Sequence, residues 1–188
     1  VDDPENLALI DKMTVNGLRN DFFGKDLDLP TEAISEKEFN ITISEGDKNY
    51  SIRGFIDKLF LYSKKCKAII RDFKSSKQVF KGKELTDNLQ NLMYALAVKH
   101  LYPKYLKRES EFVFLKFDLS TDLFGKPGSG IIRMGDMSDE ELEGFEYYLT
   151  EVQEFIDNFS EEDAHRNLAA TQRYPSDGTF GGPLACGK

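Results

Sequence analysis

The stretch Tyr50–Lys74, which reads YSIRGFIDKLFLYSKKCKAIIRDFK, decides the fold of this chain. Two apolar runs flank the polar segment Ser63–Cys66, a pattern typical of a β-hairpin. With the turn centred on that segment, residues that face each other across the two strands have numbers that add to 129. Asp57 and Asp72 satisfy this sum. We therefore expect their carboxylates to face each other on one side of the sheet, with Cβ atoms about 5 Å apart.

Strand alternation places Lys74 on the same face as the two aspartates, whereas Arg71 and Phe73 point to the other face. Two facing carboxylates in a partly apolar setting repel each other, and a divalent metal such as Mg²⁺ compensates for that repulsion. Lys74 would offset the remaining charge and orient an attacking water. The alternative interpretation is that Asp72 and Lys74 form a salt bridge on a solvated face.

The remaining pattern predicts an α+β fold with a mixed, mostly antiparallel central sheet flanked by helices. We expect one domain, because 188 residues suffice for one core but hardly for two. The expected elements are a helix over 3–23, a strand over 38–44 paired with 50–62, and a helix capped by Thr86 or Asp87 and stopped by Pro103. They continue with strands over 111–118 and 131–134. A capping box at Ser138–Glu141 then starts a long helix, whose apolar stripe faces the core up to Phe159. An irregular tail is expected over 164–188.

The charges are unevenly distributed along the chain. The whole chain carries a formal net charge of -8, which alone argues against a nucleic-acid partner. However, residues 64–83 hold eight basic side chains and one acid, whereas residues 136–163 hold twelve acids and no basic residue. The acidic segment is interpreted as a solvated helix face. The basic segment begins beside Asp57 and continues past Lys74, so it marks where an anionic partner would approach, over Lys74, Lys77, Lys81 and Lys83.

Three short motifs resemble those of one nuclease family. Gly54-Phe-Ile-Asp57, Asp72-Phe-Lys74 and Gln90-Asn-Leu-Met-Tyr94 follow the order and spacing of the GxxD, DxK and QxxxY motifs. This set is similar to the RecB-like branch of the PD-(D/E)XK nucleases, which includes phage and bacterial exonucleases and is related to CRISPR adaptation nucleases. Taken alone, Gln90 and Tyr94, four residues apart on a helix, would only complete a buried hydrogen bond.

The resemblance implies a restriction-endonuclease-like core and a metal-dependent deoxyribonuclease, often an exonuclease, that acts in DNA recombination, repair or phage replication. It implies that Asp57, Asp72 and the backbone carbonyl of Phe73 bind Mg²⁺ or Mn²⁺, and that Asp57, Asp72 and Lys74 are catalytic. It further implies that Gln90 and Tyr94 shape the site or contact the DNA, and the basic run adds Lys77 to the expected substrate-binding residues. The expected setting is the cytoplasm of a bacterium, or a phage-encoded protein there, with DNA and a helicase or recombinase as partners and no membrane.

The chain departs from the family in two respects. The family supplies a further His or Glu ligand from an upstream helix, whereas residues 3–23 offer no His and no matching Glu motif; either that helix is missing from this sequence, or Glu36 or Glu38 approaches the site. Many relatives carry a carboxyl-terminal cysteine cluster that holds an iron-sulfur centre, but this sequence has only Cys66 and Cys186. We therefore expect a fragment of a longer protein, in which alone such a cluster could form. Two alternatives stay open: a catalytically inactive nuclease-like domain that binds DNA or a partner in a larger helicase or recombination assembly, and a purely structural module.

Overall fold

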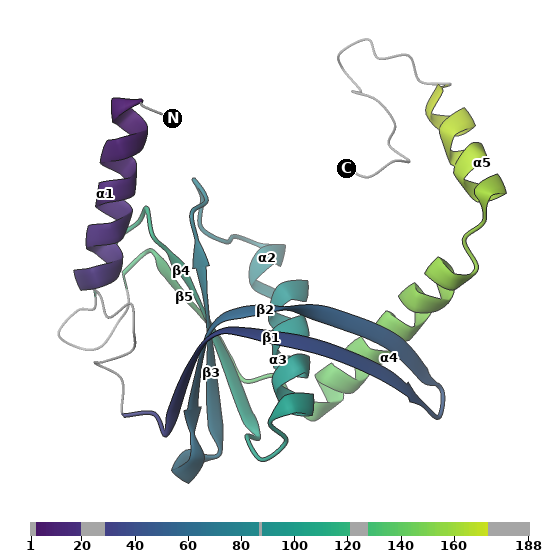
Figure 1. Cartoon of the computed structure of the whole chain (residues 1–188), viewed down its shortest axis with the longest axis horizontal. Coiled ribbons are helices and arrows are strands. Elements are labelled where there is room, and N and C mark those ends of the chain that lie inside the picture. The colour runs from purple at the N-terminus through teal and green to yellow at the C-terminus, as the bar shows by residue number, and fades with distance from the viewer. Residues whose placement is uncertain (1–2, 20–28, 87, 121–127, 173–188) are drawn as a thin grey trace.

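The computed structural model describes residues 3–19, 29–86, 88–120 and 128–172 (Figure 1). The α-helices are α1 (Pro4–Arg19), α2 (Lys83–Thr86), α3 (Leu89–Leu101), α4 (Asp139–Asp157) and α5 (Glu161–Gln172), and a single 3₁₀ turn covers Ser63–Lys65. The strands are β1 (Glu32–Glu45), β2 (Lys48–Tyr62), β3 (Lys67–Lys74), β4 (Lys107–Phe114) and β5 (Ile131–Met134). Within the described residues, no helix is long and apolar enough to cross a membrane.

The five strands form one mixed sheet in the order β1-β2-β3-β4-β5. The β1–β2, β2–β3 and β4–β5 pairs are antiparallel, whereas β3 and β4 run parallel. A parallel pair needs a crossover connection, which α2 and α3 supply here. In the β2–β3 hairpin, Lys58 pairs with Arg71 and Leu61 with Ala68, so the predicted register is confirmed.

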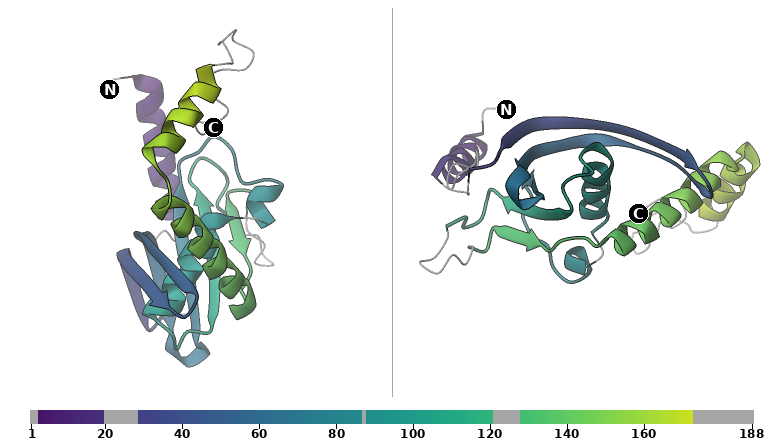
Figure 2. Two further views of the ribbon diagram at one scale, coloured as in Figure 1. Left: turned by 90° about the vertical axis from the view of Figure 1, so that its right-hand side faces the viewer. Right: turned by 90° about the horizontal axis from the view of Figure 1, so that it is seen from below.

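Helices α3 and α4 cover one face of the sheet. The main core lies there and includes Ile56, Leu59 and Ile70 from the strands and Leu96 and Leu142 from the helices, all buried. The long β1–β2 hairpin curves over α3 towards α4, as two views show (Figures 1 and 2). This curvature places α3, which follows the β2–β3 hairpin in the chain, in contact with β1, β3 and β4.

Three boundaries differ from the sequence prediction. Strand β1 begins at Glu32, six residues before the expected start, because pairing with β2 continues past the alternating segment. Helix α3 is capped by neither Thr86 nor Asp87: the side chain of Asn88 accepts a hydrogen bond of 2.9 Å from the backbone N–H of Asn91. Strand β4 occupies Lys107–Phe114 rather than 111–118, because its first residues are charged and hide the strand pattern.

The chain after Ser138 departs further from expectation. The capping box is confirmed, and α4 begins as predicted. The predicted stripe is not core throughout: Leu142 and Phe145 are buried, but Ile156 is 58% exposed, and Phe159, which follows the end of α4, is 44% exposed. The expected irregular tail over 164–188 is also wrong in its first part, because α5 continues to Gln172. Residues 173–188 lie outside the described residues.

Candidate active site

The two predicted aspartates lie at the end of the β2–β3 hairpin, one position beyond its last pair, Lys58 with Arg71. Asp72 is 4% exposed and Asp57 is half-buried. Asp57 Oδ2 accepts a hydrogen bond of 2.8 Å from the backbone N–H of Phe73. The register and this bond together hold the two carboxyl groups side by side.

Helix α3 brings Gln90 and Tyr94 to the same place. Asp72 Oδ1 accepts hydrogen bonds from Gln90 Nε2 at 2.9 Å and from the Tyr94 hydroxyl at 3.0 Å. The Gln90 amide also lies 2.7 Å from the Tyr94 hydroxyl. Because the two side chains are four residues apart on one helix, a single turn of α3 fixes both against the same carboxylate oxygen.

Lys74 completes the cluster from the end of β3. Its ammonium lies 2.7 Å from Asp72 Oδ2 and donates a hydrogen bond of 2.6 Å to Gln90 Oε1. It also lies 5.5 Å from the centre of the Phe112 ring on β4. The predicted salt bridge between Asp72 and Lys74 therefore exists, but it is buried on the core side of the sheet and not on a solvated face. Arg71 points to the opposite face of the sheet, as predicted, and its Nη2 atom lies 2.8 Å from Glu111 Oε2.

Burial dominates the electrostatics of Asp72. It raises the pKa of this carboxyl above its ordinary value; the charge of Lys74 opposes the rise and that of Asp57 adds to it. The same burial, together with the Asp72 charge, raises the pKa of Tyr94, so its phenol stays protonated and donates. A raised carboxyl pKa beside a second carboxylate and a lysine is characteristic of functional sites.

Phe39 on β1 supports the cluster, although its sequence pattern marks it only as a strand residue. It pairs with Gly54, and a Cβ atom added to Gly54 would lie 2.8 Å from Phe39 Cζ. The ring also meets that of Tyr94 edge-on, with centroids 6.3 Å apart. The glycine of the first motif is thus required for close packing, because only a residue without Cβ lets the Phe39 ring lie flat against β2 and support Tyr94.

Other predicted residues lie outside this hydrogen-bonded cluster. Lys77 is exposed in the loop after β3. Glu38 pairs with Phe55 and is exposed. Glu36 lies between the pairs that flank Asp57 on β2, but it is exposed and has a left-handed φ of 48°. The backbone N–H of Phe73 joins the cluster by donating a hydrogen bond to Asp57. The role of its carbonyl as a metal ligand stays a prediction.

The acidic pair suits a hard divalent cation. Asp72 Oδ2 is buried and makes no aligned hydrogen bond, and the nearby ammonium of Lys74 only partly balances two carboxylates. Mg²⁺ is commonly held by one or two carboxylates, with waters and substrate phosphate completing its shell. Among the described residues, no group of three His, Cys, Asp or Glu side chains could hold a metal by itself. Neither Glu36 nor Glu38, the alternatives for a further ligand, belongs to such a group.

Cys66 takes no part in the cluster. Cys66 is exposed in the turn between β2 and β3. Cys186 and the predicted cluster-like carboxyl end lie outside the described residues.

Comparison with known proteins gives one family match. The model of the PD-(D/E)XK nuclease superfamily matches residues 17–180, which include all the site residues above. A comparison with curated proteins gives no match. Among solved structures, one titled "Crystal structure of SSO0001" is similar over 85% of this chain, with 16% sequence identity and a TM-score of 0.41. The chain corresponds to 64% of the length of that structure.

Proposed function

Because the chain belongs to the PD-(D/E)XK nuclease superfamily, we propose that the Asp57, Asp72 and Lys74 cluster hydrolyses DNA phosphodiester bonds with Mg²⁺ or Mn²⁺. The observation that carries the proposal is the meeting of two motifs on one carboxylate: Asp72 is held by Lys74 of its own motif and by Gln90 and Tyr94 of the next. The order of these motifs favours the RecB-like branch, and with it exonuclease action in recombination, repair or phage replication.

In this proposal Asp57, Asp72 and the Phe73 carbonyl hold the metal. A metal bound there would neutralise phosphate charge and lower the pKa of a water. The N–H of Phe73 fixes one oxygen of Asp57, so the carboxylate is pre-oriented before any ligand arrives. The buried Asp72 Oδ2, which the Lys74 ammonium approaches to 2.7 Å, would supply the second oxygen.

Lys74 positions the attacking water. Its ammonium is held between Asp72 and Gln90, and this limits the orientations that the long side chain can adopt. A fixed cation at this position would also stabilise negative charge that develops on the phosphate. Lys77, Lys81 and Lys83 extend the positive charge beyond the cluster and would contact the DNA backbone.

The test uses the purified chain with linear and covalently closed circular DNA, each with Mg²⁺, with Mn²⁺ or with EDTA. We expect end-labelled linear DNA to be shortened progressively and the closed circle to survive, as exonuclease action requires. Asp72→Asn and Lys74→Ala should each reduce the rate by at least about 100-fold, whereas Glu140→Gln, which removes an exposed carboxylate on α4, should not. Equal rates in wild type and Asp72→Asn would overturn the assignment.

A second candidate function is supported by the acidic pair having no third ligand among the described residues. In this alternative the chain is an inactive nuclease-like domain that binds DNA, or a helicase or recombinase partner, within a larger assembly. It predicts DNA binding that weakens in Lys77→Ala and with added salt, without cleavage under any of the metal conditions. Cleavage that is lost in Lys74→Ala would exclude it.

A further inference from the structure

An apolar stripe runs along α4 and ends just past it at Phe159, and the described chain covers only its beginning. Phe145, Tyr148, Val152, Phe155 and Phe159 are separated by intervals of 3, 4, 3 and 4 residues. Intervals of this kind form the seam along which one helix packs against another. Only the first of these residues is buried. Tyr148, Phe155 and Phe159 are 47%, 68% and 44% exposed, and the helix extends away from the body of the molecule (Figures 1 and 2).

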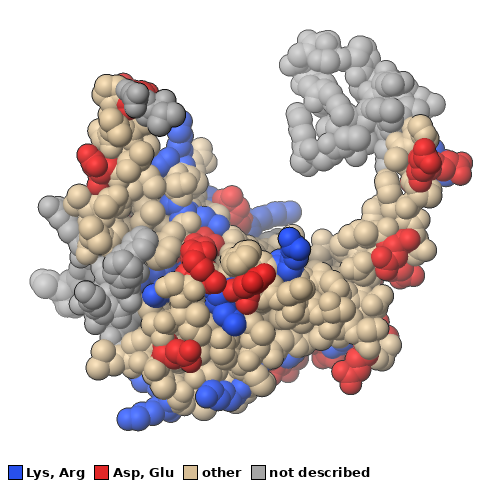
Figure 3. Space-filling view, viewed as in Figure 1, with Lys and Arg blue, Asp and Glu red and all other residues tan. Residues whose placement is uncertain are grey.

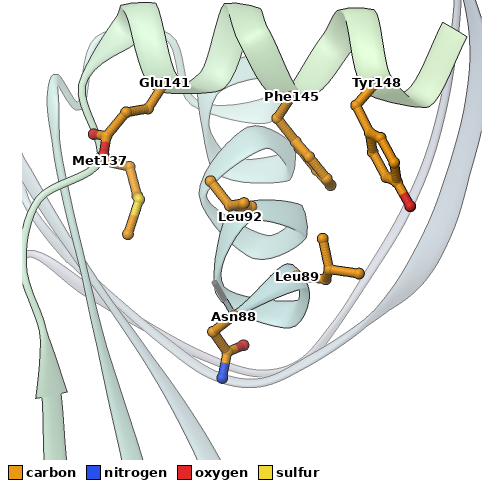
Figure 4. Close-up of a pocket in the computed structure, with 7 residues that line it drawn as sticks. All are labelled: Asn88, Leu89, Leu92, Met137, Glu141, Phe145 and Tyr148. Carbon is orange, nitrogen blue, oxygen red and sulfur yellow. The ribbon is translucent and has the colours of Figure 1, made fainter. Parts of the chain in front are cut away.

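The stripe begins in a groove between α3 and α4. Leu89 and Leu92 from α3 line one side, Phe145 and Tyr148 from α4 line the other, and Met137 closes one end (Figure 4). The groove has a volume of about 330 Å³. The rings of Phe145 and Tyr148 stack with centroids 6.0 Å apart and an angle of 19°, so the apolar floor of the groove continues into the stripe. Together they form one elongated apolar surface, here called the α4 seam.

The surroundings of the α4 seam are strongly acidic. Helix α4 contains eight Asp and Glu residues and no Lys, Arg or His. Figure 3 shows carboxylates along the projecting helices. Glu151, one position before Val152, flanks the seam and is exposed, and Glu141 lines the groove where the seam begins. Such a surface repels nucleic acid and anionic lipid, and it attracts cationic groups.

We propose that the α4 seam binds a basic amphipathic helix of a partner protein. Apolar side chains of that helix would pack on Tyr148 and Phe155, and its Lys or Arg residues would face Glu141 and Glu151. A second copy of this chain fits less well. Two α4 helices would bring sixteen carboxylates together, and α1, another helix with exposed apolar residues, carries two acids and two basic residues and so offers no opposite charge.

The probe is a fluorescent synthetic peptide of about 20 residues, with Leu at alternating intervals of three and four and Lys elsewhere. Two matched peptides act as controls: one has Glu in place of Lys, and one has the same composition with the Leu positions shuffled. We expect saturable binding of the first peptide, measured by fluorescence anisotropy, and at least about tenfold weaker binding of the other two.

Substitutions on the protein locate the site. Phe155→Ala and Tyr148→Ala should each weaken binding at least about tenfold, as expected for aromatic anchors. Leu106→Ala, which truncates a residue that is 62% exposed elsewhere, should leave binding unchanged. The double variant Glu141→Gln with Glu151→Gln should weaken binding and reduce its dependence on salt. Phe155 is exposed, so its truncation should not unfold the chain.

Several results would overturn the proposal. Equal binding by Phe155→Ala and wild type would place the peptide elsewhere. Equal binding of the shuffled peptide would show attraction by charge alone. A dimer in sedimentation experiments that is lost in Phe155→Ala would assign the seam to a second copy. Nuclease activity provides a separate readout: Phe155→Ala should retain it, so failure of this inference leaves the proposed catalytic function standing.

Discussion

The Tyr94 hydroxyl donates a hydrogen bond of 3.0 Å to the buried Oδ1 of Asp72, although the two residues belong to different motifs. The bond links the crossover helix α3 to the central strand β3. It also shows that Tyr94, the last residue of the Gln90–Tyr94 motif, orients the carboxylate of Asp72, the first residue of the Asp72–Lys74 motif.

The first prediction concerns this bond. Tyr94→Phe keeps the ring against Phe39 but removes the donor from Asp72, so we expect a loss of about 1 kcal/mol of orienting energy. The nuclease rate should fall about fivefold to tenfold, with little change in thermal stability. Gln90→Ala should cause a larger loss, because Gln90 holds both Lys74 and Asp72. Single-turnover rates at saturating metal would measure both effects, and a Tyr94→Phe rate equal to wild type would contradict this role.

The second prediction concerns the stability of the site against pH. Burial raises the pKa of Asp72 above its ordinary value of 3.8, so the folded chain binds this proton more tightly than the unfolded chain does. The contribution of Asp72 to the free energy of unfolding therefore falls as pH rises from about 4 through its raised pKa. Asp72→Asn should consequently be more stable than wild type at pH 7, by a few degrees in Tm if the difference is about 1 kcal/mol.

The measurement is a series of melting curves for wild type and Asp72→Asn between pH 4 and pH 8, without divalent metal. The difference in Tm should be small at the acid end and grow towards neutral pH. Adding Mg²⁺ should raise the Tm of wild type more than that of the variant. A variant less stable than wild type at pH 7 would show that the Lys74 charge outweighs burial.

The third prediction tests the close packing at Gly54. A Cβ atom there would lie 2.8 Å from the Phe39 ring, so Gly54→Ala should lower the free energy of unfolding by about 1–3 kcal/mol. Gly144→Ala is the matched control, because a Cβ atom there meets nothing within 4 Å and the residue lies inside α4. The control should stabilise the chain by up to about 1 kcal/mol. Urea unfolding would separate the two, and equal effects would refute the packing argument.

The fourth prediction concerns the attachment of α4 to the sheet. Glu146 is buried, and burial alone would raise its pKa, but hydrogen bonds from Tyr50 at 2.7 Å and Lys48 at 2.9 Å outweigh burial and lower the pKa. Its ionised form therefore stabilises the fold above pH 4.5, and this stabilisation is lost as pH falls further. Glu146→Ala should lower the free energy of unfolding at pH 7 by about 1–3 kcal/mol.

Glu143→Ala is the control for that experiment. Glu143 is exposed and lies 3.9 Å from the same lysine, so its removal should change stability by less than about 0.5 kcal/mol. Denaturant unfolding at pH 7 and again near pH 3.5 would test both statements. An effect of Glu146→Ala that persists unchanged at the lower pH would rule out an ionic origin.

The sequence is sufficient to predict the centre of this site. A short polar turn fixes the register of β2 against β3, and strand alternation then places Asp72 and Lys74 on one face. Helical spacing places Gln90 beside Tyr94. Each of these inferences uses residues that are close in the sequence, where local geometry leaves few alternatives.

The contacts that the sequence does not reveal depend on distant partners. Phe39 supports Tyr94 only because the β1–β2 hairpin curves over α3. The sequence pattern does not show where β4 begins, because Arg108 and Glu111 are charged and yet buried. Their partners, Asp139 and Arg71, lie in other elements. The amphipathic pattern of α4 predicts an apolar face but not how far along the helix that face is covered.

The parallel pairing of β3 with β4 has a consequence for how the chain reaches its working state. Closure of this pair must wait for the crossover through α3, and contacts that span such a long loop form late in folding. Gln90 and Tyr94 lie on that crossover, whereas Asp57 and Asp72 lie in the preceding hairpin. The acidic pair can therefore form early in folding. The hydrogen bonds that orient it form only once the crossover helix has docked on the sheet. A partly folded chain would thus contain the two facing carboxylates before Gln90 and Tyr94 orient them.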